Sequence, residues 1–259
     1  MEKTLLITGA TRGIGLATLK LFLSKGYYVV GTYYRKQDVA QKLLAEYGSH
    51  RLEFHQLFQG NQHSHQQLIS QLGRKIDVLI NNAGLGSKTV EQVSKNQFEQ
   101  DQALLHVNAL GPLWLCQSLV PSMLERGGKI INVASVGGGI THFPSFRLAD
   151  GMSKAALTFM TKQLASEHVH SNIDIFAICP GATNTDMFNA STLDSLSYEE
   201  RAQFIANLAK KRLIEPSEIA NLCLFLASEQ SQILHGAIID ASMGLGVAPE
   251  LVSKRENTT

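Results

Sequence analysis

Short apolar runs alternate with longer amphipathic segments along the chain. The apolar runs are typical of strands buried on both faces, and the amphipathic segments are typical of helices. The predicted strands are 4–7, 27–33, 51–57, 76–80, 129–133, 173–179 and 237–240. The predicted helices are 14–25, 37–47, 66–72, 98–123, 150–169, 198–210 and 216–227, with a polar loop at 59–64 and a kink at Pro112. This alternation predicts an α/β fold: a doubly wound, mainly parallel seven-stranded sheet with helices on both faces.

Small and polar residues follow several of the predicted strands. Glycines 9, 13 and 15 follow the first strand, and the runs 81–84, 135–139 and 180–181 follow the fourth, fifth and sixth. Ligands of parallel α/β sheets bind at the carboxyl ends of the strands, so we expect these runs to converge on one edge. A strand, a glycine turn and a helix N-terminus together offer backbone N–H groups to a phosphate.

Composition narrows the class of protein. The chain has 259 residues, which suits one domain over 1–259, and no linker interrupts it. A hydrophobic content of 44% and a net charge of +1 exclude a disordered tail and give no reason to expect nucleic acid. No apolar run reaches the roughly 18 residues of a membrane span. The first strand starts at Thr4, which leaves no room for a signal peptide.

Cysteine and histidine spacing gives no sign of a metal site. Cys116, Cys179 and Cys223 are odd in number and far apart, which favours buried thiols in a reducing compartment, the cytoplasm. The histidine pairs at 63 and 65 and at 168 and 170 are two residues apart. On a helix such residues point in different directions, so we expect no metal.

At four blocks the chain resembles the short-chain dehydrogenase/reductase family. The blocks are Thr8-Gly-Ala-Thr-Arg-Gly-Ile-Gly15, Asn81-Asn-Ala-Gly84, Val107-Asn-Ala-Leu-Gly111 and Pro180-Gly-Ala-Thr-Asn-Thr185. The resemblance implies a Rossmann-type domain that binds NAD or NADP, acts on a small-molecule substrate and forms a homodimer or homotetramer. The cofactor-binding residues it implies are Gly9, Thr11, Arg12, Gly13, Ile14, Gly15, Arg35, Asn81, Ala83, Gly84, Lys154, Pro180, Gly181, Thr183 and Thr185.

The resemblance also implies a catalytic set, with one departure. In the family an Asn, a Ser, a Tyr and a Lys act together. Asn108, Ser135 and Lys154 match the first, second and fourth of these. Asp150 stands four residues before Lys154, where the tyrosine is expected. The catalytic residues predicted for this chain are therefore Asn108, Ser135, Asp150 and Lys154.

An aspartate at position 150 changes the proton chemistry. Carbonyl reduction needs a proton at the oxygen, and a lysine that lowers the pKa of a tyrosine holds an aspartate in its ionised form. From an ordinary pKa of about 3.9, protonating an aspartate at pH 7 costs roughly 4 kcal/mol. Aspartate is also shorter, so a bridging water has to restore its reach. We expect either a structural ion pair of Asp150 with Lys154 that also caps the helix, or another acid, with His142 as the candidate.

The cofactor pocket departs from the family as well. Phe58 or Gln59 stands where the family often has an Asp for the adenine amino group, and Phe58 is either a stacking partner or part of the core. The second strand ends with Tyr33, Tyr34 and Arg35, without an acidic residue for the ribose of NAD. Arg35 together with Arg12 suits a 2′-phosphate, so NADP(H) is favoured over NAD(H).

Three functions remain open from the sequence. The first is an NADP(H)-dependent oxidoreductase on a small carbonyl or alcohol, with an atypical active site. The second is a nucleotide-binding protein with a regulatory or structural role, and the third is a non-redox lyase that uses Asp150 as its base. Residues 183–213, with Met187, Phe188 and Leu193, are the expected substrate lid. The helices 98–123 and 150–169 are the expected subunit interface, because they are apolar on more than one stripe.

Overall fold

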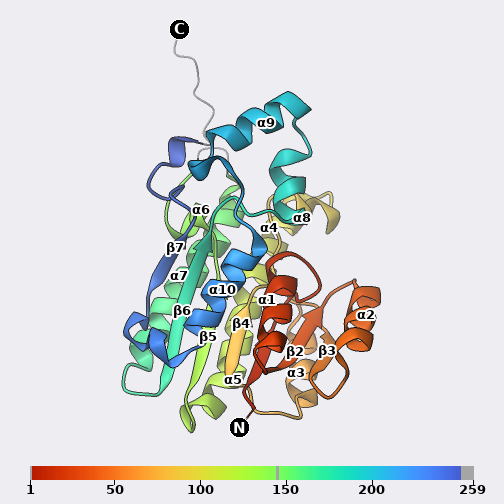
Figure 1. The fold of residues 1–259 in the computed structure, drawn as a ribbon, viewed down its shortest axis with the longest axis vertical. Helices are drawn as coiled ribbons and strands as arrows, with labels where there is room; N and C mark the ends of the chain where they lie inside the picture. The colour runs from red at the N-terminus through yellow and green to blue at the C-terminus, as the bar shows by residue number, and fades with distance from the viewer. Residues whose placement is uncertain (1, 144–145, 252–259) are drawn as a thin grey trace.

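The centre of the molecule is a sheet of seven parallel strands (Figure 1). The computed structural model describes residues 2–143 and 146–251. The strand order is β3-β2-β1-β4-β5-β6-β7, and every neighbouring pair is parallel. The strands are β1 (Thr4–Ile7), β2 (Tyr28–Tyr33), β3 (Leu52–Gln56), β4 (Val78–Asn81), β5 (Gly128–Val133), β6 (Ile173–Pro180) and β7 (Ile238–Ala241). The predicted fold class is confirmed.

Helices cover both faces of the sheet. On one face lie α1 (Gly13–Ser24), α2 (Gln37–Tyr47) and α10 (Pro216–Leu226). On the other lie α3 (Gln62–Gln71), α5 (Gly111–Leu124) and α7 (Leu148–Glu167). The remaining helical elements are η1 (Thr89–Gln92), α4 (Gln97–Leu105), η2 (His106–Leu110), α6 (Val136–Gly139), α8 (Asp186–Phe188), η3 (Asn189–Leu193), α9 (Tyr198–Asn207), η4 (Ala209–Lys211), η5 (Glu229–Leu234) and η6 (Pro249–Leu251).

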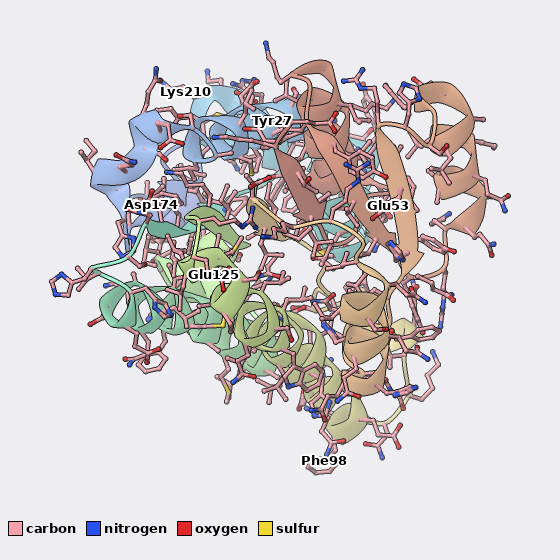
Figure 2. All side chains as sticks on the ribbon, turned by 90° about the horizontal axis from the view of Figure 1, so that it is seen from below. Tyr27, Glu53, Phe98, Glu125, Asp174 and Lys210 are labelled. Carbon is pink, nitrogen blue, oxygen red and sulfur yellow. The ribbon has the colours of Figure 1, made fainter. Side chains whose placement is uncertain are left out.

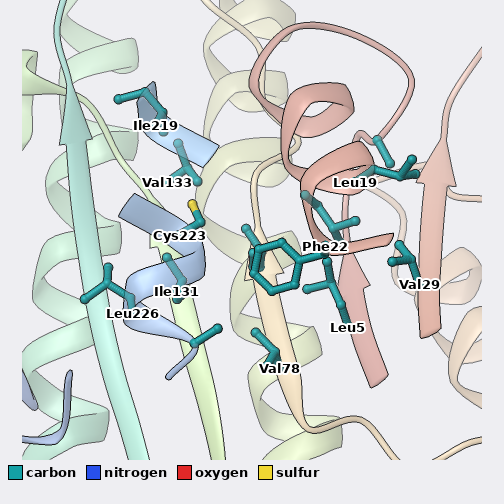
Figure 3. Close-up of a cluster of buried hydrophobic side chains, with 14 of the residues drawn as sticks. Leu5, Leu19, Phe22, Val29, Val78, Ile131, Val133, Ile219, Cys223 and Leu226 are labelled. Atoms are coloured by element: carbon teal, nitrogen blue, oxygen red, sulfur yellow. The ribbon is translucent and has the colours of Figure 1, made fainter. Parts of the chain in front are cut away.

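Successive residues of each strand supply the two cores. Leu5 and Ile7 of β1 pack in the first cluster with Phe22 of α1, and Figure 3 shows this cluster between the sheet, α1 and α10. Leu6, between them in sequence, packs in the second cluster with Leu115 of α5. All of these side chains are fully buried. A central strand therefore reads as a continuous apolar run, because both of its faces are covered.

Several helix boundaries differ from the prediction by one to four residues, and two of the departures have an identifiable cause. Helix α3 begins at Gln62 because the side chain of Asn61 accepts a hydrogen bond from the Ser64 N–H at 2.9 Å. The predicted loop over 59–64 was therefore wrong for its second half. The long helix has its irregularity before Pro112, at the π-turn η2, and Pro112 lies in the first turn of α5. A proline is tolerated there, because its missing N–H falls within a turn that is already irregular.

The joined helix Gln97–Leu124 has the length and hydropathy of a membrane span, alone among the helices of the described residues. Several of its apolar residues are packed in the protein core. Leu115, Cys116 and Met123 are fully buried in the second core cluster, against the sheet. Packing of α5 between the sheet and its neighbouring helices accounts for this hydropathy.

The strand order reverses between β1 and β4, which is the switch point of the sheet. Chain segments diverge to opposite faces there, and this leaves room at the carboxyl ends of the strands. Beyond that edge stand α8 and α9 (Figure 1). The fold therefore places the glycine turn, the loop after β4 and the segment after β6 around one opening.

Candidate active site

A cavity of about 1160 Å³ lies at the carboxyl ends of the strands. Segments that follow β1, β2, β3, β4, β5 and β6 all contribute to it. Most of the predicted site residues line it: Gly9, Thr11, Arg12, Gly13, Ile14, Arg35, Ala83, Gly84, Ser135, Asp150, Lys154, Pro180, Gly181, Thr183 and Thr185. Gly15, Asn81 and Asn108 are outside the lining.

The turn between β1 and α1 depends on glycine. Gly9 has φ +69° and Gly13 has φ +51°, in the left-handed region that side chains disfavour. A Cβ added at Gly15 would lie 2.1 Å from the carbonyl oxygen of Gly9. Arg12 at the N-cap of α1 makes no side-chain cap hydrogen bond. The first N–H groups of α1 are therefore free of a side-chain cap at a helix end that Gly13 and Ile14 expose to the cavity.

Asn82, which sequence reasoning did not single out, fixes this turn. Its side-chain Nδ2 donates to the carbonyl oxygens of Thr8 (2.9 Å) and Gly9 (3.2 Å). The Thr8 hydroxyl accepts in return from the Asn82 and Ala83 N–H groups at 3.0 and 2.9 Å. The adjacent Asn81 points elsewhere: its buried amide donates to Asn132 Oδ1 at 2.8 Å. The two asparagines thus have different structural tasks, one at the turn and one in the core.

The side of the cavity near β2 and β3 is aromatic and basic. Tyr34 and Phe58 both line it, with ring centroids 5.1 Å apart and nearly perpendicular ring planes. The Arg35 guanidinium lies over the Tyr34 ring at 4.8 Å. Within residues 2–143 and 146–251, neither Arg12 nor Arg35 forms an ion pair with an acidic side chain. Two cations thus face the cavity, and neither is held in an ion pair within the described part of the chain.

Gln59 has a side-chain amide without a protein partner. The residue is buried and lines the cavity, yet its Oε1 and Nε2 atoms make no hydrogen bond to the part of the chain that the structure describes. A buried amide left unpaired is costly, so such a group usually meets water or a ligand. Both amide atoms are inaccessible, and the amide lies against the start of α5, since a Cβ added at Gly111 would lie 2.7 Å from Gln59 Nε2.

Asn108 ties the loop after β4 to α7. Its Oδ1 accepts from the Leu85 N–H at 2.8 Å, and its Nδ2 donates to the Leu85 carbonyl oxygen at 2.8 Å. The same Nδ2 donates to Ser153 Oγ at 3.0 Å, and Ser153 Oγ donates to the Asp150 carbonyl oxygen at 2.7 Å. Asn108 is fully buried within the π-turn η2. It connects three elements and stays behind the cavity wall.

Asp150 is bonded to a serine instead of to Lys154. The Ser87 hydroxyl donates to Asp150 Oδ2 at 2.8 Å, and Lys154 Nζ donates to the Val133 carbonyl oxygen at 3.3 Å. No ion pair joins Asp150 to Lys154. Arg147 is the N-cap of α7, so Asp150 stands inside the first turn. The expected ion pair and cap were therefore wrong, although an acid in the first turn still favours the helix dipole.

Burial decides the electrostatics of this pair. Asp150 is 3% exposed, and burial raises its pKa above the ordinary range, while Lys154, Ser87 and Arg147 oppose the rise. Burial also lowers the pKa of Lys154, with Asp150 and Cys179 opposing. The expectation that the lysine keeps Asp150 more ionised than usual was wrong, because desolvation of the carboxylate outweighs the attraction. A proton is thus more easily held at Asp150 than at an exposed aspartate.

Of the remaining predicted residues, some line the cavity and others lie outside the lining. Ser135 lines the cavity, and its hydroxyl accepts from the Gly137 N–H at 3.2 Å. His142, the alternative acid, is exposed and lies outside the lining. Met187 and Phe188 of the predicted lid line the cavity, whereas Leu193 is buried beneath it.

Known proteins match this chain over nearly its whole length. A family model described as enoyl-(acyl carrier protein) reductase matches residues 9–246. A 3-oxoacyl-(acyl-carrier-protein) reductase, FabG, of Staphylococcus epidermidis is 30% identical, with 95% of this chain and 99% of the relative covered.

Solved structures show the same architecture. An actinorhodin polyketide ketoreductase variant with NADPH superposes with a TM-score of 0.83 at 25% identity, over 95% of this chain and 97% of the other. A 3-oxoacyl-(acyl-carrier protein) reductase with bound NAD, from Brucella melitensis, gives a TM-score of 0.79 at 26% identity, over 94% and 90%. The first of these two structures contains NADPH and the second contains NAD.

Proposed function

Because this chain belongs to the short-chain dehydrogenase/reductase family, we propose that it is an NADP(H)-dependent oxidoreductase that interconverts a small carbonyl compound and its alcohol at an atypical active site. One observation carries the proposal. A single cavity joins an uncapped helix N-terminus at a glycine turn to the cluster of Ser135, Asp150 and Lys154. The first part suits a dinucleotide, and the second suits a carbonyl oxygen.

The residues of the cavity fit the cofactor. The glycine turn and the N-terminus of α1 suit the pyrophosphate, and the guanidinium groups of Arg12 and Arg35 suit a 2′-phosphate. Tyr34 and Phe58 offer aromatic faces to the adenine. When bound, the nicotinamide cofactor supplies the hydride for carbonyl reduction.

The chain's own residues handle the substrate oxygen. We assign the Ser135 hydroxyl to orient the carbonyl, and the partly buried Lys154 to stabilise negative charge near it. We assign Asp150 to hold the proton before it is transferred, because burial raises the pKa of its carboxyl group. Asn108 acts through the loop after β4 and holds it against α7.

The substrate class follows from the relatives and the lid. Because the similar FabG reductase is named for 3-oxoacyl chains, a 3-oxoacyl thioester is the substrate we propose. Residues 183–213 serve as its lid within one domain over 1–259, with Met187 and Phe188 toward the cavity. All three cysteines are free and buried, which supports a reducing compartment, the cytoplasm.

The decisive experiment is a titration with NADPH followed by turnover of acetoacetyl-CoA. Loss of NADPH absorbance that depends on the thioester supports the reductase. Nucleotide binding without turnover on any carbonyl supports the regulatory or structural role instead. Conversion of a substrate without a change in cofactor absorbance supports the lyase.

We expect NADPH to bind more tightly than NADH. Hydrogen bonds to charged groups contribute about 1.5 to 3 kcal/mol, which is about ten- to a hundredfold in Kd. Arg35→Ala should narrow the difference between the two Kd values, measured by fluorescence titration. Lys42→Ala, at an exposed cation of α2 outside the cavity, is the control and should leave the difference between the two Kd values unchanged. Equal affinities in the unmodified protein would contradict the assignment.

We also expect a homodimer or homotetramer that uses α4 and α7. Leu148, Met152 and Phe159 lie on one stripe of α7 and are 78%, 52% and 71% exposed. Phe98 of α4 is 82% exposed, and Figure 2 shows it at the margin of the molecule. An apolar stripe of this kind normally has a covering surface.

Light scattering at micromolar concentration tests the assembly. Phe159→Asp should produce monomers, because it places a charge within the apolar stripe that the second subunit is expected to cover. Ile233→Asp, at a 93% exposed position of η5, is the matched control and should leave the mass unchanged. A monomeric wild-type protein would refute the interface.

A further inference from the structure

Asp150 is placed to hold a proton but is buried behind another side chain. Ser87 lies in the loop between β4 and η1, and both Ser87 and Asp150 line the cavity. The Ser87 hydroxyl meets Asp150 Oδ2 at 2.8 Å, although the two residues are 63 positions apart. Asp150 is 3% exposed, whereas Ser87 is partly exposed. A group that approaches Asp150 from the cavity therefore has Ser87 within its reach.

The loop that carries Ser87 is fixed on both sides. Before it, Asn108 bonds both the N–H and the carbonyl oxygen of Leu85 at 2.8 Å. Around it, Thr89 Oγ1 accepts from the Gly86 N–H at 2.8 Å and donates to the Gly86 carbonyl oxygen at 3.3 Å. Gly86 is also close to the lid, since a Cβ added there would lie 3.3 Å from Met187 Sδ. A serine held this firmly is preorganised for one partner.

We propose that Ser87 is a catalytic residue that passes a proton from the Asp150 carboxyl group to the substrate oxygen. A hydroxyl can donate and accept at the same time, so it extends the reach of a short carboxyl group. The proposal rests on the reductase function, and it makes a bridging water unnecessary.

The proton balance of this relay closes. As the Ser87 O–H bond breaks, an O–H bond forms on the substrate oxygen. The proton of Asp150 moves to Ser87 Oγ in the same event, so Ser87 ends as it began and Asp150 ends as a carboxylate. The two electrons and the hydrogen at the substrate carbon come from the nicotinamide cofactor. Asp150 then regains its proton from solvent.

The charges around Asp150 are compatible with this task. Lys154 stands one turn further along α7 and bonds Val133, and Arg147 is engaged by Asp101 at 2.6 Å. Burial raises the pKa of Asp150 against these cations, so the carboxyl group keeps its proton to higher pH than an exposed aspartate.

The test compares Ser87→Ala with Ser87→Thr, which retains the hydroxyl. Ser87→Ala should lower kcat with acetoacetyl-CoA by about a hundredfold, within the range of a positioned general acid. Ser87→Thr should restore most of the rate, and the NADPH Kd should stay unchanged in both. Ser70→Ala, at an exposed serine of α3 whose hydroxyl donates to the Gln67 carbonyl oxygen, is the control. A Ser87→Ala enzyme as fast as the wild type would overturn the relay.

A double-mutant cycle separates the relay from a structural role. In an Asp150→Tyr background the phenol donates directly, so Ser87→Ala should have no further effect on kcat. Equal losses in both backgrounds would mean that Ser87 only supports the loop, and would overturn the proposal.

An infrared pH titration of the protein without nucleotide gives a readout independent of turnover. A protonated-carboxyl band that is missing in Asp150→Asn belongs to Asp150. Its midpoint should move to higher pH in Ser87→Ala, because the hydroxyl bond stabilises the carboxylate. If the wild type and Ser87→Ala titrate identically, the relay is overturned but the reductase function is not. A wild-type protein that binds NADPH and reduces no carbonyl overturns the reductase function itself, and the relay with it.

Discussion

Replacing Asp150 with tyrosine is expected to raise the rate of ketone reduction by about tenfold or more. Lys154 already lies one turn later on α7, and its Nζ would be 3.4 Å from a Cβ built at Gly84 on the cavity wall. A nearby cation lowers the pKa of a phenol from its ordinary value of about 10. Tyrosine also has the length to reach the substrate oxygen without Ser87.

The expected rate gain of Asp150→Tyr depends on the direct proton donor that the wild-type site lacks. A positioned general acid raises a reaction rate by about 10²- to 10⁴-fold. A relay of two coupled proton transfers, from Asp150 to Ser87 and from Ser87 to the substrate, should give only part of that increase. The unmodified protein should therefore reduce ordinary ketones slowly. The measurement is kcat for acetoacetyl-CoA, followed by NADPH absorbance.

Asp150→Phe is the matched control for this gain. It fills the same space without a hydroxyl, so it should fall below the wild-type rate. Asp150→Asn should bind NADPH normally, because the residue stands beside Ser87 and away from the glycine turn. Brisk ketone reduction by the wild type that Asp150→Asn leaves unaffected would show that Asp150 is no part of the chemistry.

Much of the fold could be predicted from the sequence because local pattern and burial agree. Each central strand is apolar on both sides, as Leu5, Leu6 and Ile7 show, and this pattern has few other solutions. The start of α3 was missed although a signal existed: Asn61 is a good N-cap, three residues before Ser64. The π-turn η2 was missed without such a signal, and the bond of its Asn108 to Leu85 spans 23 positions of sequence.

The site was harder to predict, because its contacts cross long stretches of chain. The loops were placed at the correct edge by topology alone. Nothing local distinguishes Asn82, which holds the turn, from Asn81, which enters the core. The hydrogen bond of Ser87 with Asp150 joins the loop after β4 to the first turn of α7, 63 positions later in the sequence. The sign of the Asp150 pKa shift also follows from burial, which no spacing of residues reveals.

Gly15→Ala is expected to abolish most of the nucleotide affinity. The added Cβ would lie 2.1 Å from the Gly9 carbonyl oxygen and 2.6 Å from Asn82 Nδ2. The first atom is backbone of the turn itself, and the Asn82 amide is already fixed by its bonds to Thr8 and Gly9, so neither can easily move aside.

Forced displacement of packed atoms costs about 1 to 3 kcal/mol, and at the upper end this is about a hundredfold in Kd. Titration with NADPH measures the loss, and the melting temperature should fall as well, because Asn82 joins the turn to β4. Gly73→Ala is the control: no heavy atom lies within 4 Å of a Cβ at that exposed glycine. If Gly15→Ala kept the wild-type Kd while Gly73→Ala did the same, the turn after β1 would not be where the nucleotide binds, and the assignment of this cavity to a dinucleotide would fail.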